Sequence, residues 1–222
     1  LAIDSLHIIG DIFDRGPRAD IIMNELMHFH DVDIQWGNHD ISWMGAATGN
    51  PACVCNVLRI AISYNSFDVL EDGYGINLLP LATFAVNTYR EDPCTCFKLR
   101  GGGIYNAKEM EADLKMHKAI SIIQFKVEGQ IIKAHPEMGL EDRNLLHRID
   151  YEKGTIFLAG KEYTLLDTNF PTIDPADPYT LTAEEADIME RLERAFLNCE
   201  RLQRHMRFLL SRGSLYKVYN QN

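Results

Sequence analysis

The sequence lacks any apolar run long enough to span a bilayer, and it lacks a basic segment followed by an apolar one, as in secretory signals. It also shows no internal repeat and no low-complexity tract. Five cysteines are few for a disulfide scaffold, and an odd number cannot all pair within one chain. We therefore interpret them as reduced thiols of a cytoplasmic protein. The missing signal itself carries little weight, because the chain opens at Leu1 without an initiator methionine.

Basic residues are also scarce. Lys and Arg number 22 against 32 Asp and Glu, which gives a net charge of −10. Such a chain is a poor nonspecific partner for nucleic acid or for an anionic membrane, and we expect neither as a partner. Its 222 residues suffice for one large domain or for a core with an insertion.

Two glycine-bounded polar loops each follow a short apolar run. Gly10–Gly16 follows the run Leu6–Ile9, and Gly37–Asp40 follows the run Val32–Trp36. Apolar residues recur at helical spacing between them, so strand, helix and strand follow one another with short links. This order predicts parallel strands, whose carboxyl ends meet at one edge of a sheet. We therefore expect the two loops to lie side by side.

The side chains of these loops suit a two-metal phosphoester hydrolase. Such a site needs a carboxylate that bridges two cations, a guanidinium that forks onto phosphate oxygens and an imidazole that protonates the leaving alkoxide. The alternative is two glycine turns with ordinary polar residues. We favour the site, because strand-end loops are where α/β folds place chemistry. The candidate residues are Asp11, Asp14, Arg15, Asn38 and His39.

The two loops read GDxxDRG and GNHD, which resemble the middle two signatures of the calcineurin-like metallophosphoesterases. The wider sequence looks like the class III fructose-1,6-bisphosphatases of Firmicutes and related bacteria, and this resemblance covers nearly the whole chain. Asp40 stands where the related protein phosphatases carry Glu. The similar stretches are Asp4–Ile9, Arg18–Met23, Asp33–Asp40, Glu71–Leu78, Arg204–Phe208 and Gly213–Tyr216.

This resemblance implies hydrolysis of the 1-phosphate of fructose 1,6-bisphosphate in gluconeogenesis, with a small sugar bisphosphate as partner and a two-metal site that holds Mn²⁺. It implies that Asp11 bridges the metals and that Asn38 binds one of them. His39 would act as the general acid, Asp14 would hold its orientation, and Arg15 would grip the phosphate. Local Arg and metal charge would then have to outweigh the acidic balance of the chain.

Part of the superfamily's ligand set is missing. It includes an Asp-x-His motif upstream and two later His ligands, and the sequence contains neither. His7 does not supply the first, because no Asp stands two positions before it. We therefore expect the chain to be an internal fragment of a longer enzyme, inactive alone, with its remaining metal ligands elsewhere.

The expected fold class is α/β, as part of a metallophosphoesterase αββα sandwich core. We assign residues 1–49 to this core, 50–212 to a mainly helical insertion with a small hairpin, and 213–222 to a returning core strand. Within these limits the patterns predict helices over 17–30, 42–47, 53–64, 78–89 and 107–125, hairpin strands over 155–158 and 163–166, a single long helix from the capping box Thr182-x-x-Glu185 to near Gly213, and a strand over 214–219.

Several other features have simpler interpretations. We interpret Gly101–Gly103 as a flexible turn, because no Lys and Ser/Thr pair on a helix follows it. Cys53-x-Cys55 and Cys94-x-Cys96 lack the spacing of structural zinc sites. Structural or surface roles are expected for the remaining histidines that we considered, namely His28, His30, His135 and His205.

Two alternative functions remain open at this stage. One is another calcineurin-like phosphoesterase, acting on a phosphoprotein or a dinucleoside polyphosphate. The other is a non-catalytic binding module on a phosphatase fold, against which the intact polar loops argue.

Overall fold

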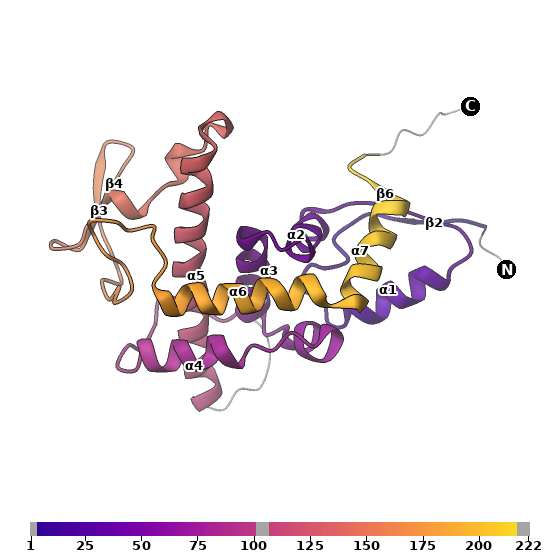
Figure 1. Ribbon diagram of the computed structural model, residues 1–222, viewed down its shortest axis with the longest axis horizontal. Helices are drawn as coiled ribbons and strands as arrows, with labels where there is room; N and C mark the ends of the chain where they lie inside the picture. Colours follow the sequence, from indigo (N-terminus) through magenta and orange to yellow (C-terminus); the bar gives the residue numbers. More distant parts are fainter. Residues whose placement is uncertain (1–3, 101–106, 217–222) are drawn as a thin grey trace. The chain divides into compact units, whose positions relative to one another are not determined.

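The computed structural model describes residues 4–100 and 107–216 of the chain. It divides into two compact units (Figure 1). The first unit comprises Leu1–Asn77 and Arg191–Asn222, and the second comprises Leu78–Glu190. These limits differ from the core and insertion expected at 1–49 and 50–212. A division into compact units does not show which segment is inserted into which domain. The predicted helical insertion therefore stays a prediction.

The first unit contains a parallel three-stranded sheet. Strand β1 (Leu6–Ile8) pairs with β2 (Val32–Gln35), and β2 pairs with β6 (Gly213–Ser214), all in parallel. Helix α1 (Ala19–His28) connects β1 to β2, which confirms the predicted strand, helix and strand. The loops that follow β1 and β2 therefore leave the sheet at the same edge.

Two boundaries in this unit differ from the sequence patterns. Helix α1 begins at Ala19 rather than Pro17, because Arg18 takes a left-handed conformation (φ 59°) and its guanidinium pairs with Asp20. The returning strand covers only Gly213–Ser214 among the described residues, and 217–222 lie outside them. Gly213 is needed there, because a Cβ would lie 1.9 Å from Nε1 of Trp36.

Helices cover the rest of the first unit. They are α2 (Asn38–Ala47), α3 (Pro51–Tyr64), a π-helical turn (Val69–Gly73) and α7 (Glu200–Arg212). Asn50 caps α3 by accepting a hydrogen bond from the Cys53 N–H (3.0 Å). The sequence pattern predicted α2 and α3 but did not predict the π-helical turn.

The predicted single helix from Ala183 to near Gly213 is wrong. Helix α6 (Ala183–Asn198) ends before Cys199, and α7 begins at Glu200. Cys199 is extended (φ −76°, ψ 99°), and its Sγ accepts from the Leu202 N–H and donates to the Tyr74 carbonyl. No Gly or Pro marks this break in the sequence, since contacts with a distant segment stabilise it.

The second unit is built on two helices and a hairpin. Helix α4 (Leu79–Thr88) packs against α5 (Ala107–Ala134), which runs nine residues beyond the predicted end at Phe125. Strands β3 (Ile149–Asp150), β4 (Thr155–Leu158) and β5 (Lys161–Thr164) form an antiparallel sheet. The hairpin is confirmed, but β5 starts at Lys161 rather than Tyr163. Ala159 and Gly160 make the two-residue turn, both with positive φ.

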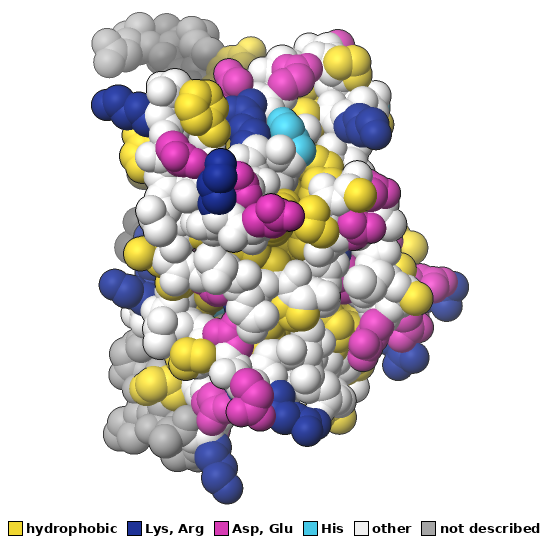
Figure 2. All heavy atoms as spheres, turned by 90° about the vertical axis from the view of Figure 1, so that its left-hand side faces the viewer, with side chains coloured by type: hydrophobic (Ala, Val, Ile, Leu, Met, Phe, Trp, Pro, Cys, Tyr) yellow, Lys and Arg dark blue, Asp and Glu magenta, His cyan; other side chains and the backbone are white. Residues whose placement is uncertain are grey.

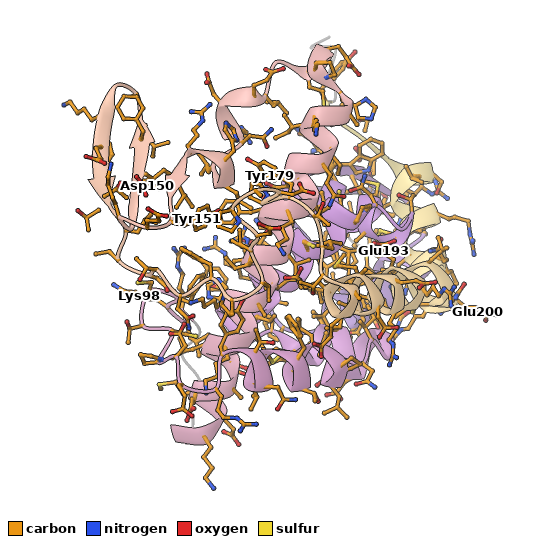
Figure 3. The ribbon with its side chains drawn as sticks, turned by 60° about the vertical axis from the view of Figure 1, so that its left-hand side comes forward. Lys98, Asp150, Tyr151, Tyr179, Glu193 and Glu200 are labelled. Carbon is orange, nitrogen blue, oxygen red and sulfur yellow. The ribbon has the colours of Figure 1, made fainter. Side chains whose placement is uncertain are left out.

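Short 3₁₀ turns, Pro136–Met138, Glu141–Arg143 and Leu146–Arg148, lead from α5 to the hairpin. The ring of Tyr179, labelled in Figure 3, packs against Gly129 of α5, where a Cβ would lie 2.1 Å from the ring. The Tyr179 hydroxyl lies 2.8 Å from Nδ1 of His147. These contacts hold the connection before α6 against the middle of α5.

Two lysines of α5 are fully buried inside the second unit. Lys118 Nζ pairs with Asp92 and with Asp167 (2.6 Å) and lies 4.9 Å from the ring centre of Tyr89. Lys126 Nζ pairs with Glu185 (2.7 Å). Glu185 also completes the predicted capping box with Thr182, which is confirmed. Lys126 lies just after Phe125, so a buried charge interrupts the apolar pattern there although the helix continues.

The face drawn in Figure 2 carries acidic and basic side chains close to one another. Among the helices that the structure describes, none combines the length and the apolar character needed to cross a membrane.

The elements of the described residues are mixed α/β with helix predominating, in agreement with the predicted class.

Candidate functional site

The first polar loop turns sharply away from β1. Gly10 and Asp11 both have positive φ (62° and 53°), which is common for glycine and unusual for aspartate. A Cβ on Gly10 would lie 2.5 Å from the Gly37 nitrogen. Glycine is therefore required here, because the backbone of the first loop rests directly on the backbone of the second.

The second loop receives the Asp11 carboxylate. A Cβ on Gly37 would lie 2.0 Å from Asp11 Oδ1, so this carboxylate occupies the space that a side chain would fill. The His39 N–H donates to the same oxygen (3.1 Å). Asp11 thus sits at the N-terminal end of α2, where unpaired N–H groups favour an anion.

His39 and Asp14 form a pair across the two loops. His39 Nε2 lies 2.9 Å from Asp14 Oδ1, and the side chains are 18% and 26% exposed. Beside them is a small recess of about 10 Å³, room for roughly one water molecule. Its walls include Phe13, Asp14, His39, Ser42 and Trp43. The imidazole is therefore oriented by a carboxylate and remains accessible from solvent.

Arg15 lies at the outer side of this pair. Its Nε donates to both Asp14 oxygens (2.9 and 3.0 Å), its Nη1 donates to the Tyr64 hydroxyl (3.3 Å), and its guanidinium carbon lies 5.0 Å from the Tyr64 ring centre. These contacts raise the pKa of Arg15, with the Tyr64 hydrogen bond as the largest cause. Tyr64 could not be identified from the sequence, since an aromatic residue at the end of a helix carries no distinctive signal.

Asp40 is the one fully buried carboxylate among the motif residues. Its Oδ2 accepts from the N–H groups of Asp11 (2.8 Å) and Gly37 (2.9 Å), and its Oδ1 accepts from the Phe13 N–H (3.2 Å). Burial raises the pKa of the Asp40 carboxyl, while these three N–H donors oppose the rise. In the sequence, Asp40 distinguishes the resembled families but carries no signal of this bonding role.

The structure thus brings four of the five predicted residues into direct contact across the loops: Asp11, Asp14, Arg15 and His39. Asn38 is the first residue of α2 and is exposed, and it directly precedes His39, whose N–H binds the Asp11 carboxylate. The backbone carbonyl of Asn38 accepts a hydrogen bond from Ser42 Oγ (3.0 Å).

The donor set fits a hard divalent cation in kind, since Asp11 offers a carboxylate oxygen and Asn38 an amide oxygen. The number of such ligands is too small for a complete coordination shell. Within residues 4–100 and 107–216, no group of three or more His, Cys, Asp or Glu side chains is arranged to hold a metal ion. A cation bound at Asp11 and Asn38 would therefore need further ligands from outside the described residues.

The remaining histidines have structural contacts. Buried His205 bridges the Tyr74 hydroxyl (2.9 Å) and Asn24 Oδ1 (3.0 Å). His28 Nδ1 meets the Asn24 carbonyl one turn back (2.6 Å), and His30 Nε2 meets the Asp4 carbonyl. His135 pairs with Glu137 on the surface. These contacts agree with the structural and surface roles predicted for them.

All five cysteines are thiols, as predicted. The pKa of Cys94 is raised to about 12, mainly by burial, which keeps this sulfur protonated at neutral pH. The glycine triplet Gly101–Gly103 lies outside the described residues, so its interpretation as a turn stays a prediction.

The parallel strands and the paired loops define an α/β protein with a polar site at the carboxyl ends of its strands. A family model for the Firmicute fructose-1,6-bisphosphatase matches residues 1–222, and the chain belongs to this family.

The chain is similar to proteins named fructose-1,6-bisphosphatase class 3. It is 60% identical over 223 residues to that of Clostridium novyi, 56% over 224 residues to that of Alkaliphilus metalliredigens and 56% over 225 residues to that of Bacteroides thetaiotaomicron. Each match covers 100% of this chain and 34% of the relative, so the chain spans about a third of their length. No solved structure matches the chain.

Proposed function

We propose that this chain forms part of the active site of a metal-dependent fructose-1,6-bisphosphatase. The enzyme hydrolyses the 1-phosphate of fructose 1,6-bisphosphate to give fructose 6-phosphate, a step of gluconeogenesis in the cytoplasm. The observation that carries the proposal is the contact of Asp11, Asp14 and His39 across two strand-end loops. Family membership and the names of the relatives support the choice of substrate.

His39 and Asp14 supply the proton chemistry in this proposal. His39 Nε2 donates a hydrogen bond to the Asp14 carboxylate (2.9 Å), which orients the imidazole. The other ring nitrogen, Nδ1, then donates its proton to the bridging oxygen at C1 of the sugar as the bond from that oxygen to phosphorus breaks. Arg15 binds the phosphate oxygens with N–H groups not used on Asp14 and Tyr64, since a guanidinium has five donors.

Asp11 and Asn38 would hold divalent cations, Mn²⁺ being the ion that the resemblance implies. Two such ions supply positive charge that stabilises the phosphoryl oxygens during displacement. Two oxygen ligands cannot complete an octahedral shell, and relatives are about three times as long as the matched region. We therefore place the other ligands, and the remainder of an αββα sandwich, in parts of the protein outside this chain. Residues 50–212 would be its helical insertion, and the 222 residues alone would be inactive.

The test is phosphate release from fructose 1,6-bisphosphate by a full-length protein that contains this chain, with Mn²⁺ affinity measured by calorimetry. Asp11→Ala should abolish tight Mn²⁺ binding and turnover together. Asp31→Ala is the matched control, because Asp31 is an exposed aspartate of the same unit outside the two loops. Unchanged Mn²⁺ stoichiometry in Asp11→Ala would contradict the metal role. Turnover of a phosphoprotein or a dinucleoside polyphosphate, without turnover of the sugar bisphosphate, would contradict the substrate.

A further inference from the structure

Asp40 makes more contacts than its place in α2 requires. It is the third residue of the helix, and its acceptance of the Gly37 N–H is the usual way an acidic residue caps a helix start. Its other two hydrogen bonds go to Asp11 and Phe13, which belong to the loop after β1. Helix capping explains the first bond and leaves the other two unexplained.

The donors to Asp40 come from backbone that needs support. Asp11 is held at φ 53°, an uncommon conformation for a residue with a side chain. Its N–H is the donor of the shortest of the three bonds, at 2.8 Å. Since Asp40 is fully buried, water does not compete for these bonds. One carboxylate therefore fixes the backbone of both loops at the point where they touch.

The direction of the Asp11 side chain follows from that backbone. Its carboxylate lies against Gly37, with Oδ1 accepting from the His39 N–H at 3.1 Å. A shift of the first loop would move this carboxylate away from Asn38 and His39. The same shift would move Asp14, three residues further along, away from the His39 imidazole at 2.9 Å.

We infer that Asp40 is a positioning residue that joins the two polar loops and presents the Asp11 carboxylate and the Asp14–His39 pair in one arrangement. Its effect on metal binding rests on the proposed function, whereas its effect on the loop backbone does not. Asp40 touches no reacting atom in this role. It acts through the N–H groups of Asp11, Phe13 and Gly37.

Asp40→Asn tests the inference, because it keeps the size of the side chain and replaces one acceptor oxygen with an NH₂ group that cannot accept a hydrogen bond. Asp20→Asn is the matched control. Asp20 is an equally buried aspartate of the same unit, but its partners are the guanidinium groups of Arg18 and Arg201. Both variants lose stability, so a merely structural effect appears in both.

Hydrogen–deuterium exchange of the full-length protein without metal is the first measurement. Peptides covering 10–16 should exchange faster in Asp40→Asn than in the wild type and in Asp20→Asn. Mn²⁺ affinity is the second, and it should fall about 10–100-fold in Asp40→Asn alone, as is typical when a group that orients a ligand is lost. Saturating Mn²⁺ should restore part of the turnover.

Wild-type exchange and wild-type Mn²⁺ affinity in Asp40→Asn would overturn the inference. If Asp40→Asn does not fold, amide exchange of the wild-type protein decides instead, because the Asp11 and Phe13 N–H groups must then be protected although they lie in a loop. Fast exchange at both would overturn it. A wild-type protein that leaves fructose 1,6-bisphosphate intact would contradict the proposed function, while the exchange comparison would still test the role of Asp40.

Discussion

The imidazole of His39 and the carboxylate of Asp14 lie 2.9 Å apart, although they follow different strands of the sheet. Both oxygens of Asp14 also accept from the single N–H of Arg15 Nε, so one carboxylate orients a proton donor and a guanidinium together. Proton donation and phosphate binding are therefore coupled through Asp14 in the proposed mechanism.

His39→Ala and Asp14→Asn should each keep Mn²⁺ bound and slow turnover of fructose 1,6-bisphosphate by about 10²–10⁴-fold, the usual contribution of acid–base catalysis. An aryl phosphate should suffer less, since its leaving group needs no proton. Steady-state kinetics on both substrates in the full-length protein check this. Equal losses on the two substrates would contradict the role of His39 as a general acid.

Arg15→Lys should lower kcat/KM although the charge is kept. A lysine cannot contact Asp14 and Tyr64 while forking onto two phosphate oxygens, and it loses the contact of the guanidinium with the Tyr64 ring. Tyr64→Phe is the control, since it removes the hydroxyl and keeps the ring. It should show the smaller loss. Wild-type kcat/KM in Arg15→Lys at saturating metal would remove Arg15 from phosphate binding.

Lys126→Met should destabilise the second unit by about 3–5 kcal/mol, because it leaves the Glu185 carboxylate buried without its cation. Adding Glu185→Gln to Lys126→Met should recover part of the lost stability, since neither position then carries a buried charge. Denaturant unfolding of the two single variants and the double variant measures the coupling free energy. Additive losses would show that the two side chains do not interact.

Acid should destabilise the first unit through His205. Burial, helped by Arg201 and Arg204, lowers the pKa of His205 to about 4, against an ordinary value of 6.5. The folded state therefore prefers the neutral imidazole. The contribution of His205 to the free energy of unfolding is fully present above pH 6.5 and is lost as the pH falls from 6.5 toward 4. The loss amounts to at most roughly 3 kcal/mol.

His205→Gln should flatten this pH dependence, because an amide can still bond Tyr74 and Asn24 without taking up a proton. Thermal unfolding of both proteins between pH 7.5 and pH 4.5 compares them. An equally steep fall of Tm in the variant would assign the acid sensitivity to other groups.

Local sequence was enough wherever neighbours along the chain decide the structure. Two short apolar runs and the helical apolar spacing between them predicted the parallel pair β1 and β2 and the helix that joins them. The capping box at Thr182 and Glu185 also formed as predicted. The candidate residues then followed, because parallel strands deliver their carboxyl ends to one edge.

Tertiary contacts decided the rest. The chain breaks its last long helix at Cys199 because Tyr74 offers a carbonyl there, and α5 continues past Phe125 because Glu185 and Thr172 satisfy Lys126. Neither partner is near in sequence. The same holds at the site, where Tyr64 meets Arg15 and Asp40 meets Asp11 only after folding brings them together. The sequence by itself determined which groups carry the chemistry, since residue type fixes charge and donor count, whereas folding decided their geometry, because hydrogen bonds need distances that chain order does not specify.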